Sequence, residues 1–212
     1  MRASQAYIQS LHNERDSRIN EMKAYAQEFR IPIMEDDGIS FIKQLLRIHR
    51  PKKILEIGTA IGYSAIQMAK VDPSIHITTL EVDDVRHQEA IKQINLFQLD
   101  DQIDAIHQDA LEYLSDLPDD TVYDFVFIDA AKGKNQAFVE AVDPFLRKNG
   151  LIAIDNVLFK GYVSGENTES ERLMKIGKKI HAFNQWIVQR DDFETTIVET
   201  GDGIAVALKL TE

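Results

Sequence analysis

The sequence predicts a doubly wound α/β fold with a mostly parallel, seven-stranded sheet. Apolar strand patterns alternate with helical patterns from residue 53 onward, which is typical of parallel strands joined by right-handed crossovers. A glycine-rich turn, Gly58 to Gly62, follows the first of these strands and opens a helix. The chain ends in two β-rich runs separated by Thr200-Gly-Asp-Gly203, which predicts a C-terminal β-hairpin.

Each element of this core follows from its apolar pattern. The plainest helical spacing is that of Ala137, Phe138, Ala141, Val142, Phe145 and Leu146. The predicted strands are 53–57, 76–81, 102–106, 122–128, 151–154, 193–199 and 203–210. The predicted helices are 62–70, 84–98, 109–116, 133–148 and 168–189.

Two further helices precede the core. A helix over 4–29 has a thin apolar stripe outside the α/β repeat, so the stripe must pack on the sheet layers or on another subunit. A second helix starts near Asp36 or Asp37, since Asp is a good N-cap, and ends before Pro51. The 212 residues suit one domain, with a helical cap over 1–50 and an α/β core over 53–212.

Composition limits the functional classes. No apolar run approaches the roughly 18 residues that span a bilayer, and the first residues lack the apolar core of a signal peptide. The absence of cysteine excludes disulfides, thiolate metal sites and cysteine nucleophiles. We expect a cytoplasmic enzyme with no membrane partner.

The charge is unevenly distributed. A net charge of −11 argues against broad, non-specific nucleic-acid binding. Residues 132–190 nevertheless contain ten Lys and Arg against six Asp and Glu, which gives this segment a charge of +4. The segment is either a solvated helix face or a local basic surface that could hold a phosphate backbone.

The turn after the first strand indicates which cofactor the fold binds. A dinucleotide-binding turn reads G-x-G-x-x-G, whereas here Gly58 and Gly62 are four apart and Glu56 stands at the strand end. A carboxylate there repels phosphate but suits S-adenosylmethionine (SAM), which carries a sulfonium and an α-ammonium. The alternative is a tight turn of no special chemistry.

Acidic residues also follow the next two strands. Glu81 ends the second strand and could accept hydrogen bonds from both ribose hydroxyls of the cofactor. Asp109 and Ala110 follow the third, where a carboxylate and backbone amides could meet the adenine edge. Each acid alone could equally be a solvated loop residue or a helix cap.

The fourth and fifth strands end in Asp129 and in Asp155-Asn156. Neighbouring strands lie about 4.8 Å apart, so these three side chains should converge. Two carboxylates and an amide oxygen favour Mg²⁺, with Mn²⁺ or Ca²⁺ as alternatives. The competing interpretation is a turn at Asp155-Asn156 and a helix cap at Asp129.

Lys132 lies three residues after Asp129, on the turn into the next helix. A nearby divalent cation and a sulfonium both disfavour an ammonium, so Lys132 is a candidate general base for a substrate hydroxyl. The competing interpretation is a surface lysine at a helix start.

Together these residues resemble the cation-dependent, SAM-dependent O-methyltransferases of the catechol and caffeoyl-CoA type, a class I (Rossmann-like) methyltransferase group. The matching strings are Ile54-Leu-Glu-Ile-Gly-Thr-Ala-Ile-Gly-Tyr-Ser-Ala65, Phe127-Ile-Asp-Ala-Ala-Lys132 and Ala153-Ile-Asp-Asn-Val157. The resemblance implies metal ligation by Asp129, Asp155 and Asn156, with catalysis by Lys132 and Asp129. It implies a SAM site formed by Ile33, Met34, Glu56, Gly58, Gly62, Tyr63, Ser64, Glu81, Asp109, Ala110 and Asp129.

Within that group the chain is most similar to bacterial enzymes that methylate 5-hydroxyuridine at the tRNA wobble position. The string Asp155-Asn-Val-Leu-Phe-Lys-Gly161 and the compact N-terminal helix carry this resemblance, and Phe159 replaces a Trp found in many members. The resemblance also implies a homodimer. Both 5-hydroxyuridine and catechol present two adjacent oxygens to a metal, so a small catechol or related phenol is the alternative acceptor. A non-enzymatic SAM-binding module is the third hypothesis, and the metal ligands with Lys132 argue against it.

Overall fold

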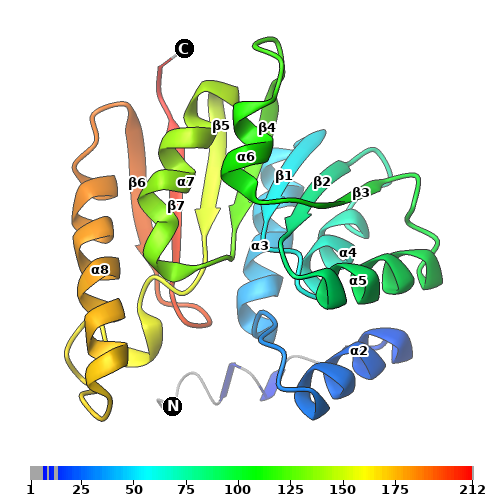
Figure 1. The fold of residues 1–212 in the computed structure, drawn as a ribbon, viewed down its shortest axis with the longest axis horizontal. Coiled ribbons are helices and arrows are strands. Elements are labelled where there is room, and N and C mark those ends of the chain that lie inside the picture. Colours follow the sequence, from blue (N-terminus) through cyan, green and yellow to red (C-terminus); the bar gives the residue numbers. More distant parts are fainter. Residues whose placement is uncertain (1–6, 9, 12–13, 212) are drawn as a thin grey trace.

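The computed structural model describes residues 7–8, 10–11 and 14–211. Seven strands form one sheet in the order β3-β2-β1-β4-β5-β7-β6, and they are spread side by side across Figure 1. The first five are parallel, and β7 runs antiparallel to both β5 and β6. This confirms the predicted doubly wound fold with its C-terminal hairpin. The strands are β1 Lys53–Ile57, β2 His76–Glu81, β3 Ile103–His107, β4 Tyr123–Ile128, β5 Leu146–Ile154, β6 Phe193–Val198 and β7 Ile204–Lys209.

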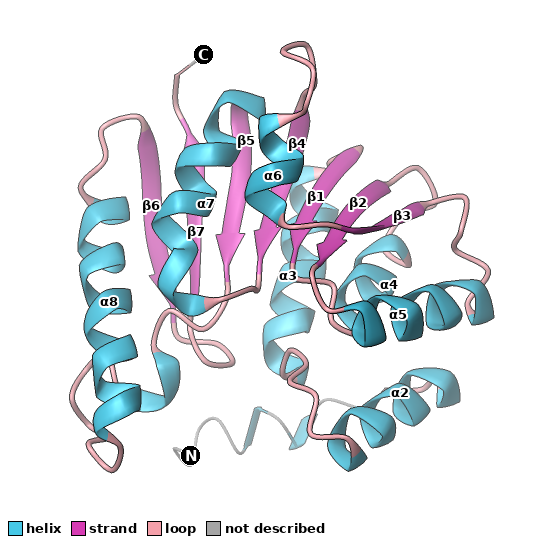
Figure 2. Cartoon of the chain, viewed as in Figure 1, coloured by secondary structure: helices cyan, strands magenta, loops and turns pink. Residues whose placement is uncertain are grey.

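Helices cover both faces of the sheet (Figure 2). The α-helices are α2 Ser17–Glu28, α3 Asp36–His49, α4 Tyr63–Ala69, α5 Asp84–Leu96, α6 Ala110–Ser115, α7 Asn135–Val142 and α8 Glu171–Val188. Three short 3₁₀ segments are η1 Lys132–Lys134, η2 Asp143–Phe145 and η3 Phe159–Gly161. Among the described residues, none of the helices has the length and apolarity to cross a bilayer.

Two hydrophobic cores follow from the alternation of side chains along the strands. Ile54 of β1 and Phe125 and Phe127 of β4 pack with α2, α3, α4 and the end of α5. Leu55 of β1 and Val126 of β4 point to the other face and pack with α6, α7 and α8. Strands buried on both faces need the near-continuous apolar runs that the sequence contains.

The predicted helix over 4–29 is wrong in its extent. Residues 14–16 are not helical, and α2 begins at Ser17 with Asp16 as N-cap. The Asp16 carboxylate accepts a hydrogen bond from the Arg18 amide and pairs with Lys70 at 2.6 Å, so capping interactions compete with helix continuation there. The stripe residues Ile19 and Met22 are buried in the chain's own core. The predicted residues 4–6, 9, 12 and 13 lie outside the described part.

The end of one helix and the N-cap of another also differ from the prediction. The helix over 133–148 ends at Val142, and Leu146 already begins β5, because Pro144 sits in a 3₁₀ turn that stops the helix. The second helix starts at Asp36 as predicted, but its N-cap is Glu35, which makes no capping bond with its side chain. The Asp37 carboxylate instead accepts a hydrogen bond from the Gly201 amide at 2.9 Å and ties α3 to the hairpin.

Candidate active site

A cavity of about 680 Å³ lies at the carboxyl ends of the parallel strands. Strand order reverses between β1 and β4, and ligands of open α/β sheets bind at such a switch point. The predicted site residues that line the cavity are Ile33, Met34, Gly58, Glu81, Asp109, Ala110, Asp129, Lys132, Asp155 and Asn156. Four predicted residues lie outside the lining. Glu56 is on β1, and Gly62, Tyr63 and Ser64 are at the N-cap and start of α4.

The glycine-rich turn lets β1 approach β4 closely. Gly58 has φ +104°, and a Cβ there would stand 2.2 Å from the Asp129 carbonyl oxygen. The Gly58 and Thr59 amides both donate to the Leu80 carbonyl, at 3.0 and 3.2 Å, which anchors the turn to β2. A side chain at position 58 would therefore force the end of β1 away from Asp129, which follows β4.

Glu56 is fully buried beneath this turn. Its Oε2 accepts a hydrogen bond from the Thr79 hydroxyl, while Oε1 has no partner among the described residues. Burial raises the pKa of Glu56 to about 8. Glu56 is therefore largely protonated at neutral pH in the cofactor-free chain, and a cation such as the α-ammonium of SAM nearby would favour its ionised form.

Glu81 is held rigidly at the end of β2. Its Oε2 accepts from the Ala60 amide at 2.8 Å, and its Oε1 accepts from the Val82 and Asp83 amides at 2.9 and 3.0 Å. The side chain is 7% exposed and lines the cavity. Carboxylate oxygens have further lone pairs, so Glu81 can also accept from a ribose.

Asp109 is a helix cap as well as a cavity residue. Its Oδ1 accepts from the Leu111 amide at 2.8 Å at the start of α6, and Lys134 Nζ lies 3.5 Å from its Oδ2. The backbone hydrogen bond from Leu111 is the largest cause that lowers the pKa of Asp109. The carboxylate is thus ionised and fixed at the cavity edge, with the Ala110 backbone beside it.

The segment before α3 covers the cavity from the N-terminal side. Ile33 and Met34 line it, and the Met34 side chain packs 3.4 Å from the position that a Cβ on Gly38 would take.

Tyr63 and Ser64 are buried in the first turn of α4. The Tyr63 hydroxyl lies 3.5 Å from Asp36 Oδ1, so it bridges α4 to the start of α3.

Asp129, Asp155 and Asn156 all line the cavity at the ends of the neighbouring strands β4 and β5. The Asp129 amide donates to Ile57 and the Asp155 amide donates to Ile128, at 2.9 and 3.0 Å, so both strand ends are held in register. Lys132 Nζ donates to Asp129 Oδ1 at 2.8 Å and to the Asn156 side-chain oxygen. Asn156 adopts φ +60°.

This cluster has the chemistry of a cation site. Burial, followed by the negative charge of Asp129, raises the pKa of the Asp155 carboxyl. A positive charge stabilises carboxylates that lie close together. The Lys132 ammonium already contacts two of the three side chains, Asp129 and Asn156. Oxygen donors without sulfur or imidazole suit Mg²⁺.

The structure adds a residue that sequence reasoning missed. Asp202, at the tip of the β6–β7 hairpin, lines the cavity and accepts a hydrogen bond from the Lys160 amide. Burial raises the pKa of Asp202. Its sequence signal, Thr200-Gly-Asp-Gly203, predicted only the turn; the pairing of β7 with β5 brings that turn beside Asp155. Other lining residues missed from the sequence include Arg86, Gln108, Phe138 and Phe159.

The sheet order, the glycine-rich turn and the acidic strand ends define the class I methyltransferase fold. Residues 9–210 match the O-methyltransferase family, and the chain belongs to it. An Arabidopsis thaliana relative provisionally named as a caffeoyl-CoA O-methyltransferase is 30% identical, over 86% of this chain and 79% of its own. A flavonoid 3',5'-methyltransferase of Vitis vinifera is 28% identical, over 90% and 83%.

Solved structures agree with this assignment. A Staphylococcus aureus protein provisionally named as a caffeoyl-CoA O-methyltransferase superposes with a TM-score of 0.90 at 34% identity, covering 98% of this chain and all of its own. A Bacillus cereus O-methyltransferase in complex with S-adenosylhomocysteine superposes with a TM-score of 0.82 at 25% identity, covering 98% and 97%. The chain is a SAM-dependent O-methyltransferase of the caffeoyl-CoA O-methyltransferase type.

Proposed function

We propose that this enzyme transfers the SAM methyl group to one of two adjacent substrate oxygens that are chelated by Mg²⁺. The contacts of Lys132 with Asp129 and Asn156, and the place of Asp155 in the same cavity lining, support this proposal. When bound, Mg²⁺ would supply a Lewis acid that lowers the pKa of the substrate hydroxyl. Asp129, Asp155 and Asn156 are the residues that would hold it.

The remaining steps belong to the chain's own residues. Glu81 would accept hydrogen bonds from the ribose and Asp109 would meet the adenine edge, so the cofactor's methyl would face the strand ends of β4 and β5. Ile33 and Met34 would exclude water from that side. Lys132 would accept the proton of the substrate hydroxyl, after which the oxygen attacks the methyl carbon and the cofactor leaves as S-adenosylhomocysteine.

For the acceptor we propose 5-hydroxyuridine in the tRNA anticodon, converted to 5-methoxyuridine. Basic side chains beside the cavity support a phosphate-bearing substrate. Lys134 and Lys160 line the opening, α8 packs against η1, and the aliphatic part of Lys179 lies beside Gly133. Lys175, Lys178 and Lys179 are exposed on α8. They extend this basic surface away from the cavity.

A small phenol or its CoA ester is the second candidate. The relatives' names favour it, since they include caffeoyl-CoA and flavonoid acceptors. Both alternatives share the adjacent oxygen pair, so the metal cluster does not discriminate between them. The basic surface would also suit the phosphates of a CoA ester.

The deciding experiment offers purified protein, SAM and Mg²⁺ to total tRNA from a strain that lacks this gene. We expect 5-methoxyuridine in the digested nucleosides, with 5-hydroxyuridine lost in equal amount. Parallel reactions contain caffeoyl-CoA or catechol instead. Methylation of these small acceptors without any of the tRNA would replace the tRNA proposal by the phenol alternative.

We propose in addition that the enzyme is a homodimer. Ile8 and Leu11, before α2, and Phe29, directly after it, are exposed, whereas the apolar residues within α2 are buried. A second copy of this chain would cover the exposed three. Light scattering at micromolar concentration should give twice the 24.2 kDa chain mass. A stable monomer would contradict the dimer.

A further inference from the structure

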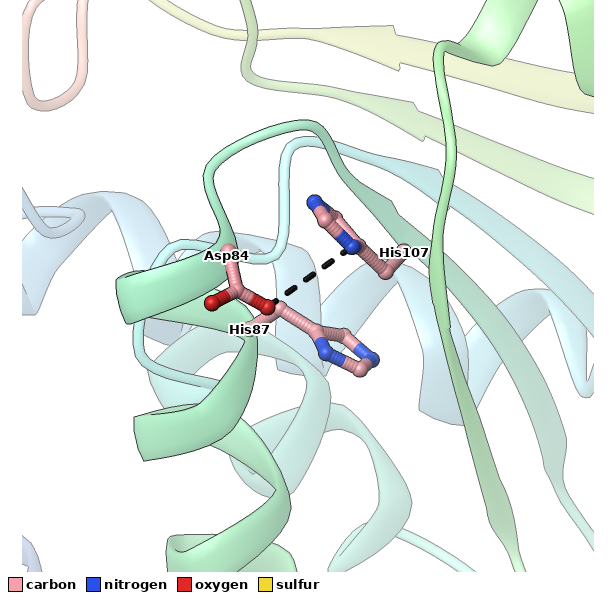
Figure 3. Close-up of side chains that lie close together, drawn as sticks. All are labelled: Asp84, His87 and His107. Atoms are coloured by element: carbon pink, nitrogen blue, oxygen red, sulfur yellow. Dashed lines mark ion pairs between the residues drawn. The ribbon is translucent and has the colours of Figure 1, made fainter.

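A second cluster of ligating side chains lies outside the active site. Asp84 and His87 occupy the first turn of α5, and His107 ends the neighbouring strand β3 (Figure 3). One ligating atom from each residue lies within 4.8 Å of the others. The two imidazole rings stack with centroids 5.3 Å apart. Nothing in the proposed methyl transfer uses these residues.

Backbone carbonyls fix the hydrogen positions of both imidazoles. His87 Nε2 lies 3.2 Å from the Ala105 carbonyl oxygen, and His107 Nε2 lies 3.0 Å from that of Val82. A carbonyl oxygen can only accept, so each Nε2 carries a hydrogen. In the neutral rings, both Nδ1 atoms therefore present lone pairs. Histidine ligands of protein-bound metals are oriented in this way, with the second nitrogen donating to a carbonyl or carboxylate.

Neither Nδ1 atom has a hydrogen bond recorded among the described residues. His87 Nδ1 is buried and unpartnered among the described residues. His107 Nδ1 lies 3.8 Å from an Asp84 carboxylate oxygen, too far for a hydrogen bond. Asp84, His87 and His107 thus each bring one ligating atom to a small cluster, and a cation is a partner that all three can share.

We infer that Asp84, His87 and His107 bind a divalent transition-metal ion of the zinc type. Imidazole nitrogen with one carboxylate suits Zn²⁺, Co²⁺ or Ni²⁺ rather than Mg²⁺. Zinc-to-ligand distances are about 2.0–2.2 Å, so two ligand atoms of a tetrahedral site lie about 3.4 Å apart. The 3.8 Å between His107 Nδ1 and the Asp84 oxygen is only slightly longer. The Asp84 side chain is 68% exposed and can turn to close the wider spacing.

Such an ion would connect two segments of the cofactor cavity. Val82, whose carbonyl orients His107, and its neighbour Glu81 line the cavity from β2, and Gln108 and Asp109 line it directly after His107. A metal bridging α5 and β3 would hold these lining segments together. Since the ligands differ from Asp129, Asp155 and Asn156, its occupancy is separable from that of the Mg²⁺ site.

Calorimetric titration of untagged protein with Zn²⁺, in excess Mg²⁺, tests the site. We expect one tight equivalent in the wild type, and an affinity at least about tenfold lower in His87→Gln, His107→Gln and Asp84→Asn. His76→Gln and His181→Gln, which change exposed histidines elsewhere, and Asp155→Asn should retain wild-type affinity. Equal Zn²⁺ affinity in His107→Gln and the wild type would overturn the site, as would loss of tight binding in Asp155→Asn.

A spectroscopic variant keeps the test valid if a glutamine variant folds poorly. The chain contains no cysteine, so His107→Cys introduces a single thiol. With Co²⁺ as probe, we expect a thiolate-to-cobalt charge-transfer band in His107→Cys that is absent in the wild type and in the control His181→Cys. A His107→Cys protein that shows the wild-type far-UV circular dichroism spectrum but no such band would contradict ligation at position 107.

Discussion

Lys132 and Asp129 form an ion pair with 2.8 Å between Nζ and Oδ1, within the cluster that we propose as the metal site. The same ammonium contacts the Asn156 side-chain oxygen. A divalent ion held there would compete with Lys132 for both oxygens and place a second positive charge beside the ammonium. The ion would thereby release Lys132 from these two oxygens, as its proposed role toward the substrate hydroxyl requires.

Lys132→Ala should therefore cut turnover by roughly 10²- to 10⁴-fold, the usual contribution of a general base. The loss should shrink as pH rises, because the substrate hydroxyl then ionises without help. Steady-state kinetics of methyl transfer from about pH 6 to pH 10 measure this. Lys92→Ala, an exposed lysine on α5, is the control. A loss below roughly tenfold at neutral pH would remove Lys132 from the base role.

Glu81→Ala should weaken SAM binding by roughly 1.5–3 kcal/mol, the scale of hydrogen bonds to a charged group. S-adenosylhomocysteine should lose the same amount because it has the same ribose. Isothermal titration of both ligands measures this. Glu194→Ala, which changes an exposed residue of β6, is the control. Unchanged affinity for both ligands would place the ribose interaction elsewhere.

Glu56 predicts a pH dependence of stability. Its pKa is about 8 in the folded chain against an ordinary 4.5, so between these values the folded state keeps a proton that the unfolded state releases. Stability from this group is therefore full below about pH 4.5 and is lost as pH rises toward 8. Glu56→Gln cannot ionise at this position. The free energy of unfolding of the wild type should therefore fall relative to that of Glu56→Gln as pH rises from about 5 to 8.

Urea denaturation without cofactor measures this difference, with Glu194→Gln as the exposed control. A wild-type-to-variant difference that stays constant over this pH range would show that Glu56 ionises normally in the folded protein.

The basic surface should affect tRNA binding rather than chemistry. Neutralising Lys160, Lys175, Lys178 and Lys179 should raise KM for tRNA and flatten its salt dependence by about 0.7–0.9 log–log slope units for each phosphate that a lysine no longer binds. Turnover at saturating tRNA should change little, and catechol, which carries no phosphate, should not respond. If tRNA kinetics are indifferent to all four changes, the surface has no role in acceptor binding.

The sequence predicts the sheet and most of the site because both depend on local patterns. Asp129 and Asp155 directly follow buried apolar runs, and parallel strands must bring such residues to one edge. Leu146 was misassigned because an apolar residue after Phe145 continues a helical stripe as well as it starts a strand. Asp202 was missed because only the β5–β7 pairing, which joins distant segments, brings its hairpin to the cavity.

Binding at Asp84, His87 and His107 was not predictable from the sequence for a different reason. It depends on which ring nitrogen of each histidine donates a hydrogen bond to a backbone carbonyl. The carbonyls concerned, those of Val82 and Ala105, belong to other segments of the fold. Spacing alone shows two histidines 20 residues apart. The direction of a lone pair requires the packed structure.

Methyl transfer by chelator-treated enzyme, with and without added Mg²⁺, tests the central claim most directly. With its preferred acceptor, tRNA or caffeoyl-CoA, the enzyme should lose transfer in EDTA and recover it with Mg²⁺, because the ligands are oxygen atoms. Asp155→Ala should abolish transfer at all Mg²⁺ concentrations while SAM affinity largely survives. Two results would contradict a metal site formed by Asp129, Asp155 and Asn156. One is full activity in excess EDTA, and the other is a loss of SAM affinity in Asp155→Ala as large as its loss of methyl transfer.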